Sequence, residues 1–142
     1  MKLHLNLTLR RAVLAAMTMV ALGSAQADIS TTTDNLKAYI TGEGEYSADA
    51  WNSFLADKGS VTIGSQAGNG TVTLTGGSYD KAPNVFIGGT NGNNGVLNVG
   101  NSSLNVSGEL NLGNSLAGGE GELTINGGSV HVGNSLYVGC YN

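Results

Sequence analysis

Four carboxylates and one histidine are the side chains in the glycine-rich part of the chain that could do acid–base chemistry: Asp80, Glu109, Glu120, Glu122 and His131. A glycosidase needs two carboxyl groups that face each other across a sugar, about 5–9.5 Å apart. Glu109, Glu120 and Glu122 fall within one repeat and could approach one another. Glu120 and Glu122 stand among glycines, however, which favours a solvated turn. The pattern therefore predicts no catalytic carboxylate pair.

The remaining reactive residues also lack partners. His131 is the only histidine after residue 27, and no second histidine completes a catalytic triad with it. Cys140 is the only cysteine, so no intramolecular disulfide forms, and we interpret it as incidental. A polysaccharide lyase needs a basic residue, yet no lysine or arginine follows Lys81. We expect a protein that is not an enzyme, with no catalytic, cofactor-binding or metal-binding residue.

Two weaker motifs have structural interpretations. The calcium-binding nonapeptide of β-rolls carries an aspartate in each turn, and residues 118–122 contain none. Asn69, Asn101 and Asn105 each match the N-glycosylation sequon. In a glycine-rich repeat they are more simply turn and ladder residues.

The N-terminal segment has the pattern of a signal peptide. Lys2, Arg10 and Arg11 precede an apolar run over residues 12–22, and residues 25–27 read Ala-Gln-Ala, a typical cleavage site. We predict cleavage before residue 28, leaving no membrane span; the alternative is an anchored N-terminal helix. The mature chain would keep three lysines and ten acidic residues, a net charge of −7. Nucleic acid is an unsuitable partner for such a chain, because phosphate contacts need Lys or Arg.

One helix is predicted, over residues 47–58. Ser47 can act as its N-cap, and Trp51, Phe54 and Leu55 share one face at helical spacing. Gly59 can end it in a left-handed conformation. Residues 28–46 are predicted to be an extended lead-in. The helix would plug the N-terminal end of the domain that follows.

From residue 59 onward, apolar–polar–apolar triplets recur at offsets of 24 to 26 residues. The first series is at 61–63, 85–87, 110–112 and 136–138. The second series is at 72–74, 97–99 and 123–125. The third series is at 104–106 and 130–132, with a degenerate first copy at 79–81. A fixed period of this length is typical of solenoids.

The triplets predict an all-β fold, a parallel β-helix of about three coils of ~25 residues, each with three short strands. Val61, Val85, Leu110 and Leu136 should stack in one interior column, because the outer residues of a triplet share a face. The middle residues point outward: Thr62, Phe86, Asn111, Tyr137, Thr73, Asn98, Thr124, Asn105 and His131. An antiparallel β-sandwich is the alternative, but it does not predict that every third strand is similar. The expected organisation is a signal peptide (1–27), a lead-in with a capping helix (28–58) and repeats (59–142).

The stretch GELTINGGSVHVGNSLYVG at residues 121–139 resembles the repeat associated with autotransporter (type V secretion) passengers and PEP-CTERM proteins of Gram-negative bacteria. The resemblance covers residues 59–142 and implies a right-handed β-helix passenger displayed on, or shed from, the cell surface. A translocator barrel and a Pro-Glu-Pro sorting motif are both missing from the sequence. We therefore expect an N-terminal fragment or a product truncated at its C-terminus.

Three functions follow as expectations. The first is an exported structural or adhesin-like surface passenger without catalytic activity, whose partners would be surface glycans or host or matrix surfaces. The second is a fragment of a polysaccharide-active β-helix enzyme, and the third is a non-functional truncation product. We also expect self-association through an uncapped C-terminal coil, because open strand edges pair with other chains.

Overall fold

The chain forms a β-solenoid of about four turns. This computed structural model describes residues 27–31, 36–65, 67–89, 92–113 and 119–139. The elements, in chain order, are β1 (Asp28–Thr31), β2 (Lys37–Tyr46), α2 (Ala48–Leu55), β3 (Ser60–Ile63), β4 (Gly70–Ala82), β5 (Val85–Ile87), β6 (Gly95–Val106), β7 (Leu110–Leu112), β8 (Gly121–Asn126), β9 (Ser129–Val132) and β10 (Leu136–Val138).

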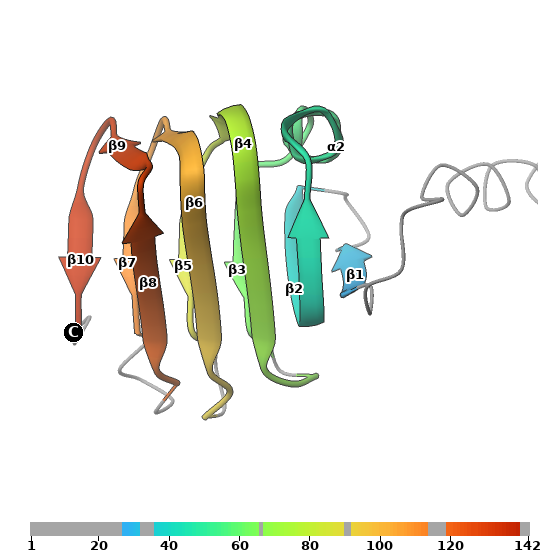
Figure 1. Cartoon of the computed structure of the whole chain (residues 1–142). Coiled ribbons are helices and arrows are strands. Elements are labelled where there is room, and N and C mark those ends of the chain that lie inside the picture. The colour runs from blue at the N-terminus through green and yellow to red at the C-terminus, as the bar shows by residue number, and fades with distance from the viewer. Residues whose placement is uncertain (1–26, 32–35, 66, 90–91, 114–118, 140–142) are drawn as a thin grey trace, which may run out of the picture.

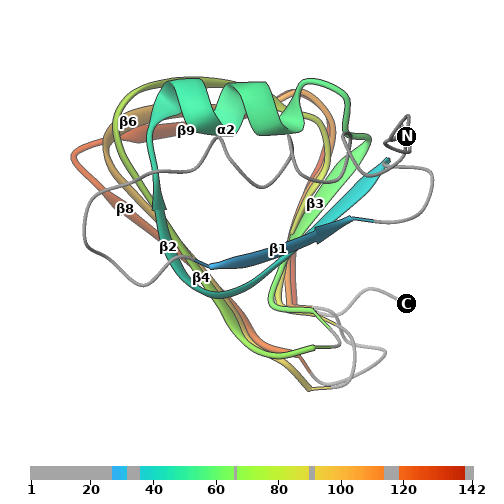
Figure 2. The ribbon, with the colours of Figure 1, turned by 90° about the vertical axis from the view of Figure 1, so that its right-hand side faces the viewer.

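Successive coils stack by parallel pairing on three sides. The first side contains the start of β2, then β3, β5, β7 and β10. The second side contains the end of β2, then the first halves of β4 and β6, and β8. The third contains the second halves of β4 and β6, and β9. Figure 1 shows the coils side by side, and Figure 2 looks along the stack, where they superimpose.

The predicted interior column is confirmed. Val61 pairs with Val85, Val85 with Leu110, and Leu110 with Leu136, all in parallel register. The side chains of Val61, Val85 and Leu110 are buried, as the alternation predicts. Stacking is required because one coil buries only a few aliphatic side chains, each worth about 1.5–3 kcal/mol. Neighbouring coils close the apolar interior, so stability is collective.

The solenoid begins earlier than the repeat pattern indicates. Residues 38–40 pair in parallel with 61–63, and residues 42–46 pair with 70–74. Strand β2 therefore forms two sides of an additional first coil. The prediction of an extended lead-in over residues 28–46 is wrong for this segment. The second triplet of this coil does not match the apolar pattern of the later copies. Gly44 lies at the position of Val72, and Tyr46 lies at the position of Leu74.

The degenerate triplet at 79–81 contains a bulge. Tyr79 pairs with Leu104, but Ala82 pairs with Val106, so β4 has one residue more than β6 in this stretch. Tyr79 and Ala82 are buried while the two residues between them are exposed. The inward residues are thus Tyr79 and Ala82, and the extra residue turns both intervening side chains outward.

Helix α2 lies on the third side of the first coil, next to the second half of β4 (Figure 2). The hydroxyl of Ser47 caps it by accepting a hydrogen bond from the Ala50 amide at 3.3 Å, as predicted. Asn52 links the helix to the strand: its Nδ2 donates to the Ser78 carbonyl at 3.0 Å, and its Oδ1 accepts from the Asp80 amide at 2.8 Å. One side-chain amide thereby satisfies backbone groups that a further strand would have paired. Gly59, expected in a left-handed conformation, does not have a positive φ.

Glycines are obligatory at the corner between the first two sides. Gly70, Gly95 and Gly121 stack in register. A Cβ added to Gly95 would lie 2.2 Å from the Ile63 carbonyl oxygen and 2.3 Å from the Gly88 amide nitrogen. These neighbours are backbone atoms, which cannot move aside without breaking the coil.

Substitution of Gly95 tests this corner. We expect Gly95→Ala to destabilise the protein by roughly 2–4 kcal/mol, because the new methyl group clashes with backbone. Gly100→Ala, in the same strand, is the matched control, since its nearest atoms would be 3.9 Å away. Urea unfolding followed by far-UV circular dichroism measures both. Equal midpoints for the two variants would contradict the corner geometry.

Candidate functional site

Asp80 serves as a structural acceptor in the bulge of β4. Its carboxylate accepts a hydrogen bond from the Ser78 hydroxyl at 2.8 Å and another from the Asn105 side-chain amide. These two hydrogen bonds, with the nearby Lys81 charge, lower the pKa of Asp80. The group is exposed and bonded to neighbours on its own and the next coil, so it links adjacent coils.

The three glutamates lie at corners of the solenoid. Glu109 directly precedes β7, and its amide donates to Asn84 Oδ1 at 2.9 Å. Glu120 lies at the other end of β7, because the following Gly121 packs against the Gly113 amide nitrogen. Its own amide donates to Asn94 Oδ1 at 3.1 Å. The length of β7 therefore separates Glu109 from Glu120.

Glu122 and His131 are exposed. The Glu122 carboxylate accepts a hydrogen bond from the Thr124 hydroxyl at 3.2 Å, and His131 pairs in register with Asn105 on the third side. Cys140 lies outside the described residues. Within the described ranges, no three His, Cys, Asp or Glu side chains are grouped so that they could hold a metal ion.

The sequon asparagines have the turn and ladder roles expected of them. The Asn69 side chain accepts a hydrogen bond from the Asn94 amide at 2.8 Å. Asn101 has a positive φ of 50° in a corner. Asn105 donates to Asp80 on the preceding coil. Such ladders satisfy polar groups between coils.

The first side of the solenoid has an outward ladder of a different kind. Its successive strands place Tyr39, Thr62, Phe86, Asn111 and Tyr137 in direct register. Aromatic and polar residues alternate, and the three aromatic side chains are partly exposed. We call the outward surface of β2, β3, β5, β7 and β10 the aromatic face.

A second row of outward residues runs beside this ladder. Lys37 pairs with Ser60, and both lie two residues before a member of the ladder, which places them on the same side of the sheet. Asn84 and Glu109 precede the next two strands in the same way. A row of polar groups therefore accompanies the row that contains the aromatic rings.

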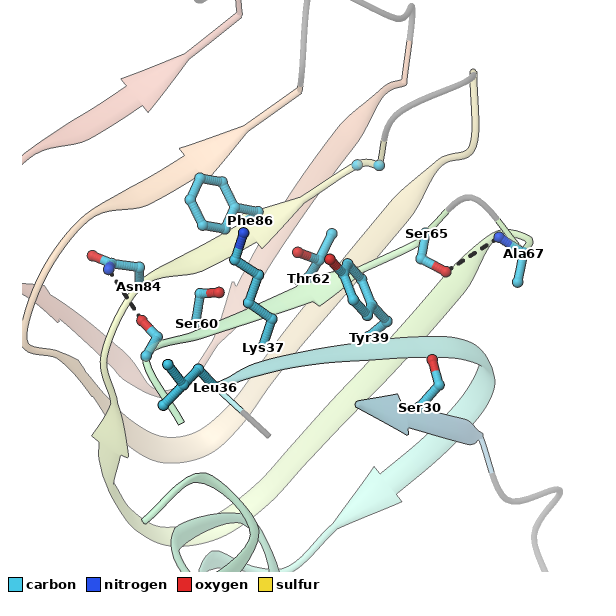
Figure 3. A pocket seen from close by; sticks show the side chains of 13 residues that line it. Ser30, Leu36, Lys37, Tyr39, Ser60, Thr62, Ser65, Ala67, Asn84 and Phe86 are labelled. Carbon is cyan, nitrogen blue, oxygen red and sulfur yellow. Dashed lines mark hydrogen bonds between the residues drawn. The ribbon is translucent and has the colours of Figure 1, made fainter. Parts of the chain in front are cut away.

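An open hollow of about 780 Å³ lies over the N-terminal half of these two rows (Figure 3). Its lining includes Leu36, Lys37, Tyr39, Thr62 and Phe86. Figure 3 shows the Lys37 side chain extending over the sheet toward the Phe86 ring. The hollow contains hydroxyls, one amine and aromatic surface. These groups can bind a ligand that has both polar groups and an apolar face.

The sequence pattern did not predict this ladder as a site. Phe86 and Tyr137 point outward as expected, but the sequence pattern does not distinguish them from the polar residues that share this position in other triplets. Tyr39 was assigned to the lead-in, so the alternation had no visible starting point. Alignment of residues 38–40 with the first triplet series would have revealed it.

Fold and site together define a β-solenoid with one aromatic outer face. Comparison of the chain with protein-family models, curated proteins and solved structures gave no significant match. In the part of the chain that the structure describes, no helix is long and apolar enough to cross a membrane.

Proposed function

We propose that the chain is an exported, non-catalytic passenger of the structural or adhesin-like kind, displayed on or shed from a Gram-negative-type cell surface. The observation that carries the proposal is that polar side chains in the repeats form hydrogen bonds between coils, which is a structural role. The side chains of Asp80, Asn84 and Asn94 are hydrogen-bonded between coils. Such a stack presents an extended surface, which is what a passenger provides.

The finer assignments belong to the same proposal. The coil is right-handed, α2 closes its N-terminal end, and the repeats belong to the autotransporter and PEP-CTERM-associated class. The resemblance of residues 121–139 supports the class, and the signal-peptide pattern before residue 28 supports export. The burial of Trp51 and Leu55, and the packing of Trp51 against Tyr46 and Tyr79, support a closing role for the helix.

Export is tested by producing the whole chain with its own N-terminus in a Gram-negative host. We expect the protein in the cell-surface or medium fraction, with an N-terminal sequence that starts at Asp28. A control with Ala25 and Ala27 both changed to Asp should retain the leader, because the cleavage site needs small residues. Unprocessed protein beginning at Met1 in the cytoplasm would overturn the proposal of export.

We further propose self-association through the last described coil. Three of its inward residues remain exposed: Ile125 at 47%, Leu136 at 55% and Val138 at 74%. Strands β8, β9 and β10 each pair on one side only in the described structure, and an apolar open edge templates pairing with another chain. A second copy of this chain would extend the same columns.

Sedimentation velocity at micromolar concentration tests this association. We expect oligomers for the parent protein and a shift toward monomer for Ile125→Lys with Val138→Lys, because buried charge opposes stacking. Thr124→Lys, on the outward side of the same coil, is the control and should still associate. A parent protein that sediments as a stable monomer would contradict the idea.

A further inference from the structure

We propose that the aromatic face binds an extended, neutral, β-1,4-linked polysaccharide, which lies along the stack of coils. The inference rests on the proposed function as a surface passenger and names the chemistry of its partner. It concerns one side of the solenoid only. Among the described residues, the outward positions in the strands of the other two sides contain no Phe, Tyr or Trp. Apart from Val96 their side chains are polar, for example Thr73, Asn98, Asn105 and His131.

The spacing of the aromatic rings carries the argument. Tyr39, Phe86 and Tyr137 occupy alternate strands of one in-register ladder. Neighbouring strands are about 4.8 Å apart, so the aromatic positions recur about every 9.6 Å along the stack. An extended β-1,4-linked chain turns each sugar over relative to the last, and its repeat of two sugars has a similar length. Every second sugar would then present the same face to a ring.

The residues between the rings provide hydrogen-bonding groups at the intervening positions. Thr62 lies between Tyr39 and Phe86, and Asn111 lies between Phe86 and Tyr137. The side-chain amide nitrogen of Asn111 has no hydrogen-bond partner although the residue is only 9% exposed. Buried donors are nearly always paired. A sugar hydroxyl held at this position would supply the partner that this donor lacks.

Charge favours a neutral glycan. The mature chain would have a net charge of −7, and the two outward rows of the aromatic face contain one cation, Lys37, and one anion, Glu109. A polyanionic chain of uronates or sulfated sugars would gain one attractive contact and be repelled by the overall field. A neutral chain avoids this cost and can hydrogen-bond to the polar groups of the second row.

The shape of the face argues against a protein partner. The central strands β3, β5 and β7 pair on both edges, so none can accept an added strand from a peptide. Phe86 is flanked by polar residues on both neighbouring strands. The apolar surface is therefore interrupted at every second strand, unlike the contiguous apolar core of protein interfaces.

Isothermal titration of the purified protein, from whichever cell fraction contains it, with cellohexaose and chitohexaose tests the proposal. We expect binding of at least one of them, with weaker binding of the corresponding disaccharide, since a disaccharide spans fewer rings. Phe86→Ala should weaken binding roughly tenfold, because it removes the central ring. Phe86→Trp should retain binding, which separates loss of stacking from loss of fold. Asn98→Ala on the second side is the matched control and should bind like the parent.

Other probes decide between glycan classes. Maltohexaose, which is α-linked and curved, and an anionic oligogalacturonate should bind at least about tenfold more weakly than the best β-linked hexamer. Equal binding of either would overturn the assignment to neutral β-1,4-linked chains. Absence of binding to both β-linked hexamers at millimolar concentration, or binding unchanged in a folded Phe86→Ala, Tyr137→Ala double variant, would overturn the site. Neither result depends on where the protein is exported.

Discussion

Replacement of Leu110 by aspartate should abolish the folded solenoid under conditions in which the parent is fully folded. Leu110 is 1% exposed and stacks between Val85 and Leu136 in the interior column. A carboxylate there has no cation or hydrogen-bond donor provided for it, and burial of an unpaired charge costs several kcal/mol. Domains of this size have only about 5–15 kcal/mol of stability in total. Far-UV circular dichroism and urea unfolding should show loss of the cooperative transition.

Two control variants separate the effect of a buried charge at Leu110 from the effect of changing Leu110 at all and from the effect of a carboxylate on the surface. Leu110→Met nearly conserves volume and should cost less than about 1.5 kcal/mol. Asn98→Asp places a carboxylate at an outward position of β6 and should change stability by about 0.5 kcal/mol, as surface substitutions do. A Leu110→Asp protein as stable as the parent would mean that Leu110 is not in the interior, and that the register is wrong.

The register of this column could be predicted from the sequence because the first triplet series is almost unbroken. Four copies with β-branched or leucine side chains at both outer positions, separated by 24 to 26 residues, allow only one alignment. Stacked identical strands then bring like side chains together. Local alternation and long-range repetition agree in this series, and such agreement makes a fold predictable.

The first coil could not be predicted in this way, because its interior is built from different side chains. Gly44 lies at an inward position, and a Cβ there would be 3.0 Å from the Tyr46 ring. The ring of Tyr46 thus occupies space that a valine fills in the next coil. The exchange conserves volume across two positions, which no comparison of single positions detects. The aromatic ladder begins in the same coil, but its first member, Tyr39, lies in a triplet at 38–40 that does align with the first series at 61–63.

An aromatic cluster fills the interior beside α2 at this end of the solenoid, while Ala38 and Ile40 continue the aliphatic column of the first side. The Trp51 ring packs edge-on against Tyr46, with centroids 5.7 Å apart, and against Tyr79, with centroids 6.4 Å apart. The Tyr79 hydroxyl donates to the Tyr46 carbonyl at 2.7 Å. Burial raises the pKa of Tyr46 to about 12. Trp51 therefore joins α2 to the first and second coils through one fully buried side chain.

Trp51→Ala should destabilise the protein by about 3–5 kcal/mol, the cost of deleting a buried tryptophan and leaving a cavity. The same change should let water reach Tyr46, so the Tyr46 pKa falls toward its ordinary value near 10 as desolvation is relieved. Urea unfolding measures the first effect, and an ultraviolet titration of tyrosine ionisation measures the second.

Phe54→Ala, on the same helix, is the control that shows whether the loss of stability comes from the buried aromatic cluster or from any truncation in the helix. Phe54 is half-buried, with Lys58 Nζ 5.7 Å from its ring centroid, and its loss should cost only about 1 kcal/mol without moving the Tyr46 pKa. Trp51→Phe should lie between the two alanine variants, because it keeps an aromatic ring and removes an indole N–H that has no hydrogen-bond partner. If Trp51→Ala and Phe54→Ala proved equally mild and left the Tyr46 pKa unchanged, the helix would not be packed on the first coil, and the aromatic cluster could not stabilise that end of the stack.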